Sequence, residues 1–162
     1  LRTYICVRVS QIAVDIEGID VLTMWSRLFA RLRGSAVWLV NQSTMTSFPS
    51  MQFGANNIGG LIFLPAGGIS GKQYATIFGA DIIEMEQCAA SGTTGDIILF
   101  APSEYIYSQA GMMTQAQSIH VYFTTGEQAF RFEMYNDGQP WWLSALTPMN
   151  GSATLGPMIV LS

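Results

Sequence analysis

The chain has 162 residues, of which 49% are hydrophobic and only 11% are charged, whereas about a quarter of a typical soluble domain is charged. This composition excludes intrinsic disorder, which needs a polar and charged chain. The formal net charge of -4 argues against a sheath for nucleic acid, which needs clustered Lys and Arg. So few ionised side chains cannot cover the surface of a domain of this size. We therefore expect part of this surface to be apolar and to contact a partner.

The N-terminal segment predicts neither export nor membrane insertion. Leu1–Ser10 carries Arg2 and Arg8 between alternating residues, which does not fit a secretory signal. No run reaches the roughly 18 apolar residues of a membrane span. The chain does not begin with Met, so we expect it to be a piece of a longer one. Cys6 and Cys88 lie far apart in the sequence and are predicted to be two reduced, packed thiols.

The first predicted element is a helix with Asp20 as its N-cap and Gly34 at the C′ position. Apolar residues recur at three- and four-residue steps and mark one buried face: Leu22, Trp25, Leu28, Phe29 and Leu32. Basic residues crowd the last turns, where the helix dipole favours cations: Arg27, Arg31 and Arg33.

Short strands are predicted after the helix. The apolar run Ala36–Val40 predicts a buried strand, and Asn41 ends it and caps a short helical stretch through Met51. Gly54–Lys72 is rich in Gly and Asn and predicts a loop, with a brief strand at Leu61–Leu64. Further strands are predicted around turn residues at Ala89–Gly95: Asp81–Glu86, Asp96–Phe100 and Tyr105–Gln109.

Alternating residues near the C-terminus predict a long antiparallel ribbon. Ser118–Thr124 and Gln128–Tyr135 both alternate, and Asn136-Asp137-Gly138 is a strong hairpin signal. We therefore expect Pro140–Ala145 to pair back on the preceding strand. Met158–Leu161 is a last short strand. The predicted fold class is α+β.

The search for catalytic chemistry is negative. Gly71-Lys72 lacks the remaining residues of a phosphate loop. His120 is the only histidine, and the sequence has no nucleophile elbow whose nucleophile it could activate. Glu84 and Glu86 share one strand face, whereas a glycosidase needs carboxylates on opposite sides of a sugar. We therefore predict no enzyme, no metal and no cofactor.

Trp141-Trp142 leaves a second class open, a carbohydrate-binding module. Adjacent residues of a strand point to opposite faces, so at most one of the two indoles can stack on a flat sugar. One Trp in the core and one at an interface is the alternative interpretation.

Four stretches, in order, carry a resemblance over nearly the whole chain. They are Asp20–Thr44, which ends in AVWLVNQST; Phe78–Cys88; the GTTGDIIL segment Gly92–Leu99, followed by Tyr105; and Ser118–Pro140, with SIHV, EQAFRF and NDGQP. Together they resemble the C-terminal portion of major capsid proteins of tailed bacteriophages and prophages, which have the Hong Kong 97 fold.

The resemblance implies a two-lobed subunit. Residues 1–111 would form an axial-like lobe, 112–145 a peripheral-like β ribbon, and 146–162 a return strand to the axial lobe. In the family, axial lobes meet around five- and six-fold axes and peripheral lobes at three-fold axes. The family's N-terminal arm, extended loop and spine helix precede the region that matches Leu1 and are expected to be absent. Lys72 does not match the cross-linking Lys of some relatives, so that activity is not carried over.

The implied function is that of a structural protein, a major capsid subunit that self-assembles through pentamers and hexamers into an icosahedral shell around DNA. Implied partners are copies of itself, scaffold, protease and portal proteins, and packaged DNA without sequence-specific contact; no membrane is involved. The protein would lie in the virion and assemble in the cytoplasm of the bacterial host. The alternative with the same fold is an encapsulin-like compartment subunit.

Eight residues are candidate assembly or fold-motif positions: Trp25, Trp38, Asn41, Glu127, Phe130, Arg131, Asp137 and Trp141. Arg131 is the only basic residue after Lys72 and lies near acidic neighbours in the sequence. We hypothesise that it forms an ion pair that fixes the ribbon geometry or a contact between subunits. The alternative is an ordinary exposed pair worth less than ~1 kcal/mol.

Overall fold

The computed structural model describes residues 7–10, 16–48, 51 and 76–162. The chain divides into two compact units: a sheet unit, Leu1–Glu104 with Trp142–Ser162, and a ribbon unit, Tyr105–Trp141. The predicted division at residues 112 and 145 differs from this one, because Tyr105–Gln109 belongs to the ribbon unit. The correspondence of these units to axial and peripheral lobes stays a prediction.

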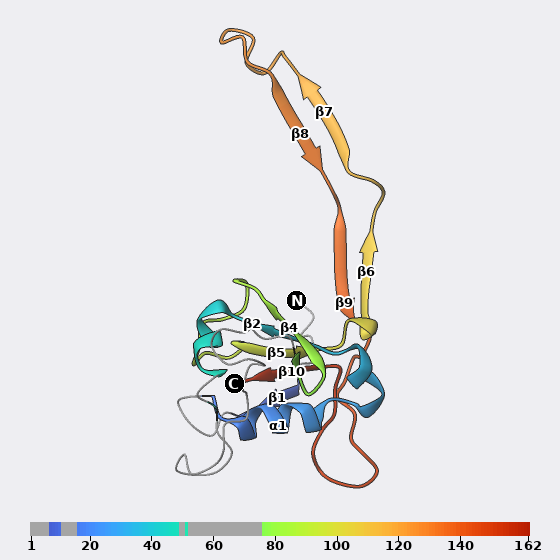
Figure 1. Ribbon diagram of the computed structural model, residues 1–162. Coiled ribbons are helices and arrows are strands. Elements are labelled where there is room, and N and C mark those ends of the chain that lie inside the picture. The colour runs from blue at the N-terminus through green and yellow to red at the C-terminus, as the bar shows by residue number, and fades with distance from the viewer. Residues whose placement is uncertain (1–6, 11–15, 49–50, 52–75) are drawn as a thin grey trace. The chain divides into compact units, whose positions relative to one another are not determined.

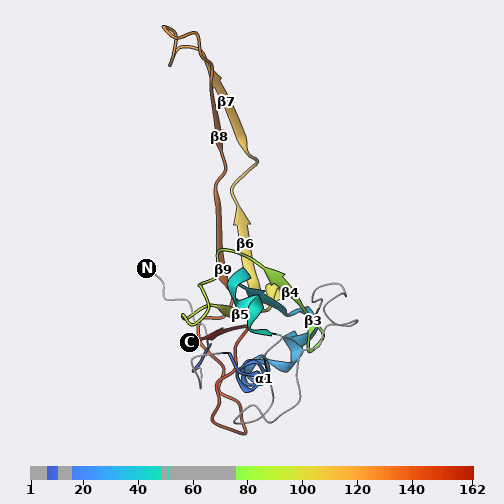
Figure 2. The ribbon, with the colours of Figure 1, turned by 60° about the vertical axis from the view of Figure 1, so that its left-hand side comes forward.

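The sheet unit contains a six-stranded mixed sheet with the order β1-β10-β5-β2-β4-β3, shown in Figures 1 and 2. Neighbours are antiparallel except for β1 with β10 and β2 with β4, which are parallel. The strands are β1 (Val7–Val9), β2 (Val37–Val40), β3 (Thr76–Ile77), β4 (Ala80–Glu84), β5 (Ile97–Phe100) and β10 (Met158–Leu161). The predicted strand Met158–Leu161 is confirmed. Those at 36–40 and 96–100 are confirmed with shorter bounds, and that at 81–86 is confirmed as Ala80–Glu84.

The core lies on one face of this sheet, where α1 (Gly18–Arg27) packs against β1 and β10. Strand register places Trp38 between Leu99 and Ile82. Because alternate residues of a strand share a face, the same side collects the buried residues Val40, Ile97, Leu99, Ile159 and Leu161.

The predicted helix 20–34 is wrong at both ends. Glu17 is the N-cap, and Asp20 Oδ2 accepts a hydrogen bond from the Glu17 backbone N at 3.2 Å. The helix ends at Arg27 because Leu28 is extended and forms a β-bridge with Gly156, whose N donates to the Arg27 carbonyl at 3.2 Å. The buried stripe is therefore Val21, Met24 and Leu28, and Leu22 is exposed.

Among the described residues, short 3-10 helices are η1 (Ala30–Ser35), η2 (Gln42–Thr46) and η6 (Pro102–Glu104). Gly34 lies inside η1 rather than at a helix C-terminus. The helical stretch predicted through Met51 is a 3-10 turn that ends at Thr46. The predicted loop Gly54–Lys72 and strand Leu61–Leu64 lie outside the described residues.

The ribbon unit consists of two successive strand pairs (Figure 1). β6 (Tyr105–Gln109) pairs with β9 (Asn136–Pro140), and β7 (Thr114–Ser118) pairs with β8 (Ala129–Glu133), both antiparallel. Between the pairs, residues 110–113 of one strand span the same gap as residues 134–135 of the other, as in a β-bulge. The Ala110 N donates to the Tyr135 carbonyl across this gap at 2.9 Å.

Two ribbon predictions are wrong. The predicted strand Ser118–Thr124 is mostly the turn at the tip, where the backbone N of Gly126 donates to the Tyr122 carbonyl at 3.1 Å. The predicted hairpin turn Asn136–Gly138 lies inside β9, which pairs with β6, so Pro140–Ala145 does not pair back on β8. The predicted strand Tyr105–Gln109 is confirmed. The predicted strand Gln128–Tyr135 is confirmed over Ala129–Glu133.

Candidate assembly surface

Trp25 and Trp38 form an aromatic cluster in the sheet unit. Trp38 is 0% exposed, and its Nε1 donates to the Ile77 carbonyl at 3.1 Å. The Trp25 ring stacks on it with centroids 6.2 Å apart and planes at 20°, and Phe78 lies 5.6 Å from Trp25. The Arg33 guanidinium lies 5.6 Å over the Trp25 ring. These two candidate positions are therefore brought together as core packing.

Asn41 joins the end of β2 to the loop that follows β4. Its Oδ1 accepts from Ser43 N at 2.9 Å, so the predicted cap is confirmed. Its Nδ2 donates to the Cys88 carbonyl at 2.7 Å and to the Glu86 carbonyl at 3.4 Å. The side chain uses both ends of its amide to fix two segments.

The Asp96 side chain also holds this loop in place by accepting a hydrogen bond from its backbone. It is 1% exposed, and its two carboxyl oxygens accept from Gly92 N at 3.0 Å and Ile97 N at 2.7 Å. Burial, together with the nearby Asp20 carboxylate, raises the pKa of Asp96 in spite of these hydrogen bonds. Burial and the Asp96 charge raise the pKa of Cys88, whose free, buried thiol confirms the prediction; Cys6 lies outside the described residues.

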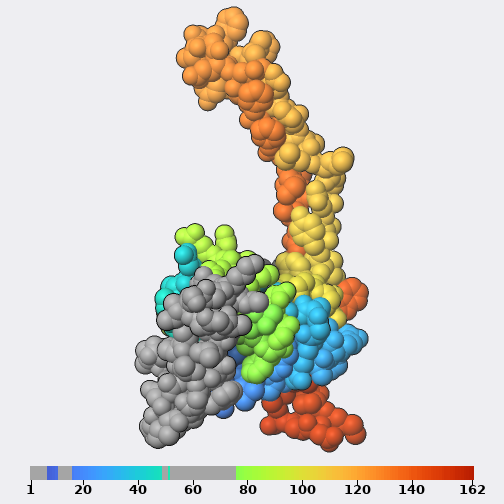
Figure 3. All heavy atoms as spheres, in the orientation of Figure 1, coloured from blue at the N-terminus to red at the C-terminus, as the bar shows by residue number. Residues whose placement is uncertain are grey.

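Large apolar side chains from both strands of the ribbon unit are exposed; this unit is the yellow and orange part of Figure 3. On β8, Phe130 and Phe132 are 54% and 57% exposed. The cross-strand register puts them on one face with Gln115 and Gln117. Further exposed apolar residues of the unit are Tyr105, Ile106, Tyr107, Met112, Met113, Ile119, Val121, Tyr122, Phe123, Met134, Tyr135 and Trp141.

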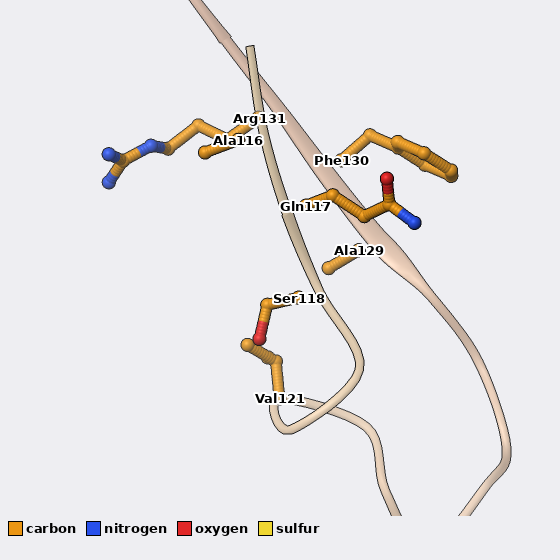
Figure 4. A pocket seen from close by; sticks show the side chains of 7 residues that line it. All are labelled: Ala116, Gln117, Ser118, Val121, Ala129, Phe130 and Arg131. Atoms are coloured by element: carbon orange, nitrogen blue, oxygen red, sulfur yellow. The ribbon is translucent and has the colours of Figure 1, made fainter.

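The two faces of β7 and β8 differ in chemistry. Figure 4 shows Phe130 and Gln117 on one side of the strands and Ala116 and Arg131 on the other. A shallow hollow of about 270 Å³ lies at the end of this strand pair. It is lined by Ala116, Gln117, Ser118, Val121, Ala129, Phe130 and Arg131.

Comparison with known proteins decides the family. A family model for the phage capsid family matches residues 9–151. The chain belongs to the phage capsid family. Its structure is similar to a solved structure described as the capsid of an empty GTA particle computed with C5 symmetry, with a TM-score of 0.67 and 14% sequence identity. The match covers 95% of this chain and 48% of that one, so the chain spans about half of its neighbour's length. No curated protein matches.

These findings confirm the predicted family and the α+β capsid fold, and they support a subunit of a capsid shell that is a component of a virion. In the described ranges, no helix of this phage capsid chain has the length and hydropathy to cross a membrane. Nor is any cluster of three His, Cys, Asp or Glu side chains placed to hold a metal ion among the residues that the structure describes.

The remaining candidate positions of this capsid chain lie in the ribbon unit without forming one cluster. Arg131 Nε lies 3.3 Å from Glu133 Oε1, and both residues are on the same face of β8. Among the described residues, Glu133 is the carboxylate that forms an ion pair with Arg131. Glu127 lies in the tip, Asp137 in β9, and Trp141 at the end of the unit. The pair is exposed, as the weaker alternative predicts, and a contact between subunits stays a prediction.

Sequence reasoning missed the packing of Tyr105 on Gly138. A Cβ atom at Gly138 would lie 2.5 Å from Tyr105 Oη and 2.6 Å from its Cε1, because the ring lies diagonally across β9. The alternation of Tyr105 and Tyr107 was the available signal, and the hairpin motif that contains Gly138 obscured it.

Replacing Gly138 with Ala in this capsid subunit is expected to push the Tyr105 ring off the strand. The loss of this cross-strand contact should weaken the β6–β9 pairing by up to about 1 kcal/mol. Hydrogen exchange of the β6 amides measures the effect. Adding Tyr105→Ala removes the clash and should make the further Gly138→Ala change almost neutral; an equal effect of Gly138→Ala with and without the ring would contradict the packing argument.

Proposed function

We propose that this chain is part of the major capsid protein of a tailed phage or prophage, and that it self-associates into an icosahedral shell around DNA. The observation that carries the proposal is the exposed apolar surface of the ribbon unit in a chain of the phage capsid family. A two-stranded ribbon is marginally stable in water by itself. Interfaces between obligate partners bury apolar surface of this kind, and the proposed occupant is a neighbouring copy of the subunit.

The shell would close through rings of five and six copies, because heterologous contacts of one surface with a different surface close when the rotation allows it. The net charge of -4 suits a lining that encloses DNA without binding it tightly. Scaffold, protease and portal proteins are the proposed assembly partners, and the proposed place of assembly is the cytoplasm of the host. We propose no catalytic role for the subunit.

The proposal predicts that Phe130→Gln with Phe132→Gln prevents assembly and leaves the subunit folded. Both side chains are exposed, so their loss removes apolar surface from an interface without opening a cavity in the core. Sedimentation velocity and electron microscopy of the protein, expressed in its full encoded length, measure assembly. Circular dichroism measures folding.

Arg131→Ala is the control on the opposite face of the same strand. It removes an exposed ion pair, so assembly is expected to continue if this pair is the ordinary one of the weaker alternative and not a contact between subunits. Loss of assembly in this variant would contradict the assignment of the contact to the Phe130 face. A wild-type protein that stays monomeric, or a double Phe variant that forms shells of normal size, would overturn the proposed function.

A further inference from the structure

The chain leaves the sheet unit at Glu104 and re-enters it at Trp142, and these two residues are joined. Glu104 ends η6 immediately before β6, and Trp142 directly follows the last residue of the ribbon unit. Trp142 Nε1 donates to Glu104 Oε2 at 2.9 Å. Because the indole N–H is only a donor and a carboxylate is only an acceptor, the bond has a single possible polarity.

The second oxygen of Glu104 completes a ring of four side chains. Arg31 Nη2 donates to Glu104 Oε1 at 3.0 Å, and the Arg31 guanidinium lies 5.7 Å over the Phe29 ring. The Phe29 ring meets the Trp142 ring edge-on, with centroids 5.8 Å apart. A hydrogen bond of 3.1 Å between the hydroxyls of Ser35 and Ser103 holds η1 beside η6 next to the ring.

The carboxylate at the centre of this ring is largely shielded. The Glu104 side chain is 15% exposed, whereas that of Arg31 is 69% exposed. Both hydrogen bonds to Glu104 involve an ionised group, and such bonds are stronger than neutral ones. Glu104 is therefore the member on which both ends of the ring depend.

Along the chain, Glu104 directly precedes Tyr105 and Trp142 follows Pro140 by two residues, and Tyr105 and Pro140 form the first cross-strand pair of the ribbon. The tip of the ribbon is closed by the covalent turn between β7 and β8, but its base has no covalent closure. A two-stranded ribbon is marginal, and a contact that keeps two chain segments together lowers the entropic cost of pairing them.

We propose that Arg31, Glu104, Trp142 and Phe29 form a latch that holds the two ends of the ribbon together. Opening the latch releases β6 from β9 and leaves the six-stranded sheet paired. The latch is a property of the single subunit, so it does not depend on the proposed function in a shell.

Hydrogen exchange of the dissociated wild-type, Glu104→Gln and Glu133→Gln subunits tests the latch. Arg31 and Trp142 donate to different oxygens of Glu104, and Gln places an NH2 group at one of these positions, so one of the two donors loses its acceptor. Exchange of the β6 and β9 amides is expected to accelerate about tenfold or more, with unchanged exchange in β2 and β5. Glu133→Gln is the matched control, because it makes the same change of charge at an exposed pair within the ribbon unit, and it should leave β6 and β9 almost unaffected.

Trp142→Phe is the second variant, since it removes the N–H donor and keeps an aromatic ring beside Phe29. It should accelerate the same amides selectively, and with Glu104→Gln the combined effect should be less than the product of the two. If Glu104→Gln does not fold, Trp142→Phe decides the question. Exchange that accelerates equally in β2 and β5, or no more than in Glu133→Gln, would overturn the proposal.

Discussion

Replacing Trp38 with Ala is expected to lower the free energy of unfolding of the sheet unit by about 3–5 kcal/mol. Trp38 is fully buried in β2, between β5 and β4 in the sheet. The substitution opens a cavity beneath Trp25, whose ring stacks on it at 6.2 Å. It also leaves the Ile77 carbonyl without the donor that lies 3.1 Å away.

Urea unfolding followed by circular dichroism measures this loss. Trp38→Phe keeps most of the ring but removes the N–H donor, so its smaller cost separates packing from the hydrogen bond. Trp141→Ala is the matched control, because this Trp is 67% exposed, and its effect should stay within about 0.5 kcal/mol. A free energy of unfolding of Trp38→Ala within about 1 kcal/mol of the wild-type value would contradict the assignment of Trp38 to the centre of the core.

Strands with a short apolar run between turn residues could be predicted from the sequence. Tyr105–Gln109 and Met158–Leu161 have the predicted bounds, because Pro and Gly residues near them restrict the backbone locally. The end of α1 could not be predicted, since Leu28 leaves the helix to pair with Gly156. That contact joins residues far apart in the sequence, and local propensity carries no information about it.

The ribbon shows a second limit of local patterns. Thr114–Ser118 has the sequence Thr-Gln-Ala-Gln-Ser and no alternation of apolar residues, yet it forms β7, because β8 supplies the apolar side chains of the pair. Asn136–Gly138 has strong turn chemistry, but Gly138 lies in a strand where the Tyr105 ring leaves no room for a Cβ atom. The sequence motif alone does not show whether Gly138 is needed for a turn or for the close packing of an aromatic ring on a strand.

The candidate site positions also divide into those that follow from the local sequence and those that depend on contacts between distant residues. The cap by Asn41 follows from residue type and position, and it is observed. Glu104 was missed because its two donors, Arg31 and Trp142, come from distant parts of the chain. The family resemblance located the fold, but it did not separate Trp25 and Trp38, which pack in the core, from Trp141, which is exposed.

Replacing Asp96 with Ala is expected to lower the free energy of unfolding by about 1–3 kcal/mol. The change removes the acceptor of Ile97 N, which is buried at the start of β5, and that of Gly92 N in the preceding loop. The loop should also exchange its amide hydrogens faster than β5 does. Asp81→Ala, an exposed carboxylate in β4, is the control for the loss of one negative charge.

Asp96→Asn tests the pH dependence of the same group. The pKa of Asp96 is raised in the folded protein by burial and by Asp20, so the folded carboxyl keeps its proton at pH values where the unfolded one has lost it. The part of the stability that arises from this raised pKa is therefore complete below the unfolded pKa, about 3.9, and is lost as the pH rises through the folded pKa; the hydrogen bonds that Asp96 accepts are a separate contribution. Asn does not titrate, so the stability of the wild type relative to Asp96→Asn should fall with rising pH.

Urea unfolding of both proteins from about pH 4 to 7 measures this difference, and the titrations shared by the two chains largely cancel. Two other groups interact electrostatically with Asp96, the Asp20 carboxyl and the Cys88 thiol. Cys88→Ser in both backgrounds removes the thiol from the comparison. A stability difference that rises with pH would mean that the hydrogen bonds from Gly92 and Ile97 outweigh burial and hold the carboxylate ionised.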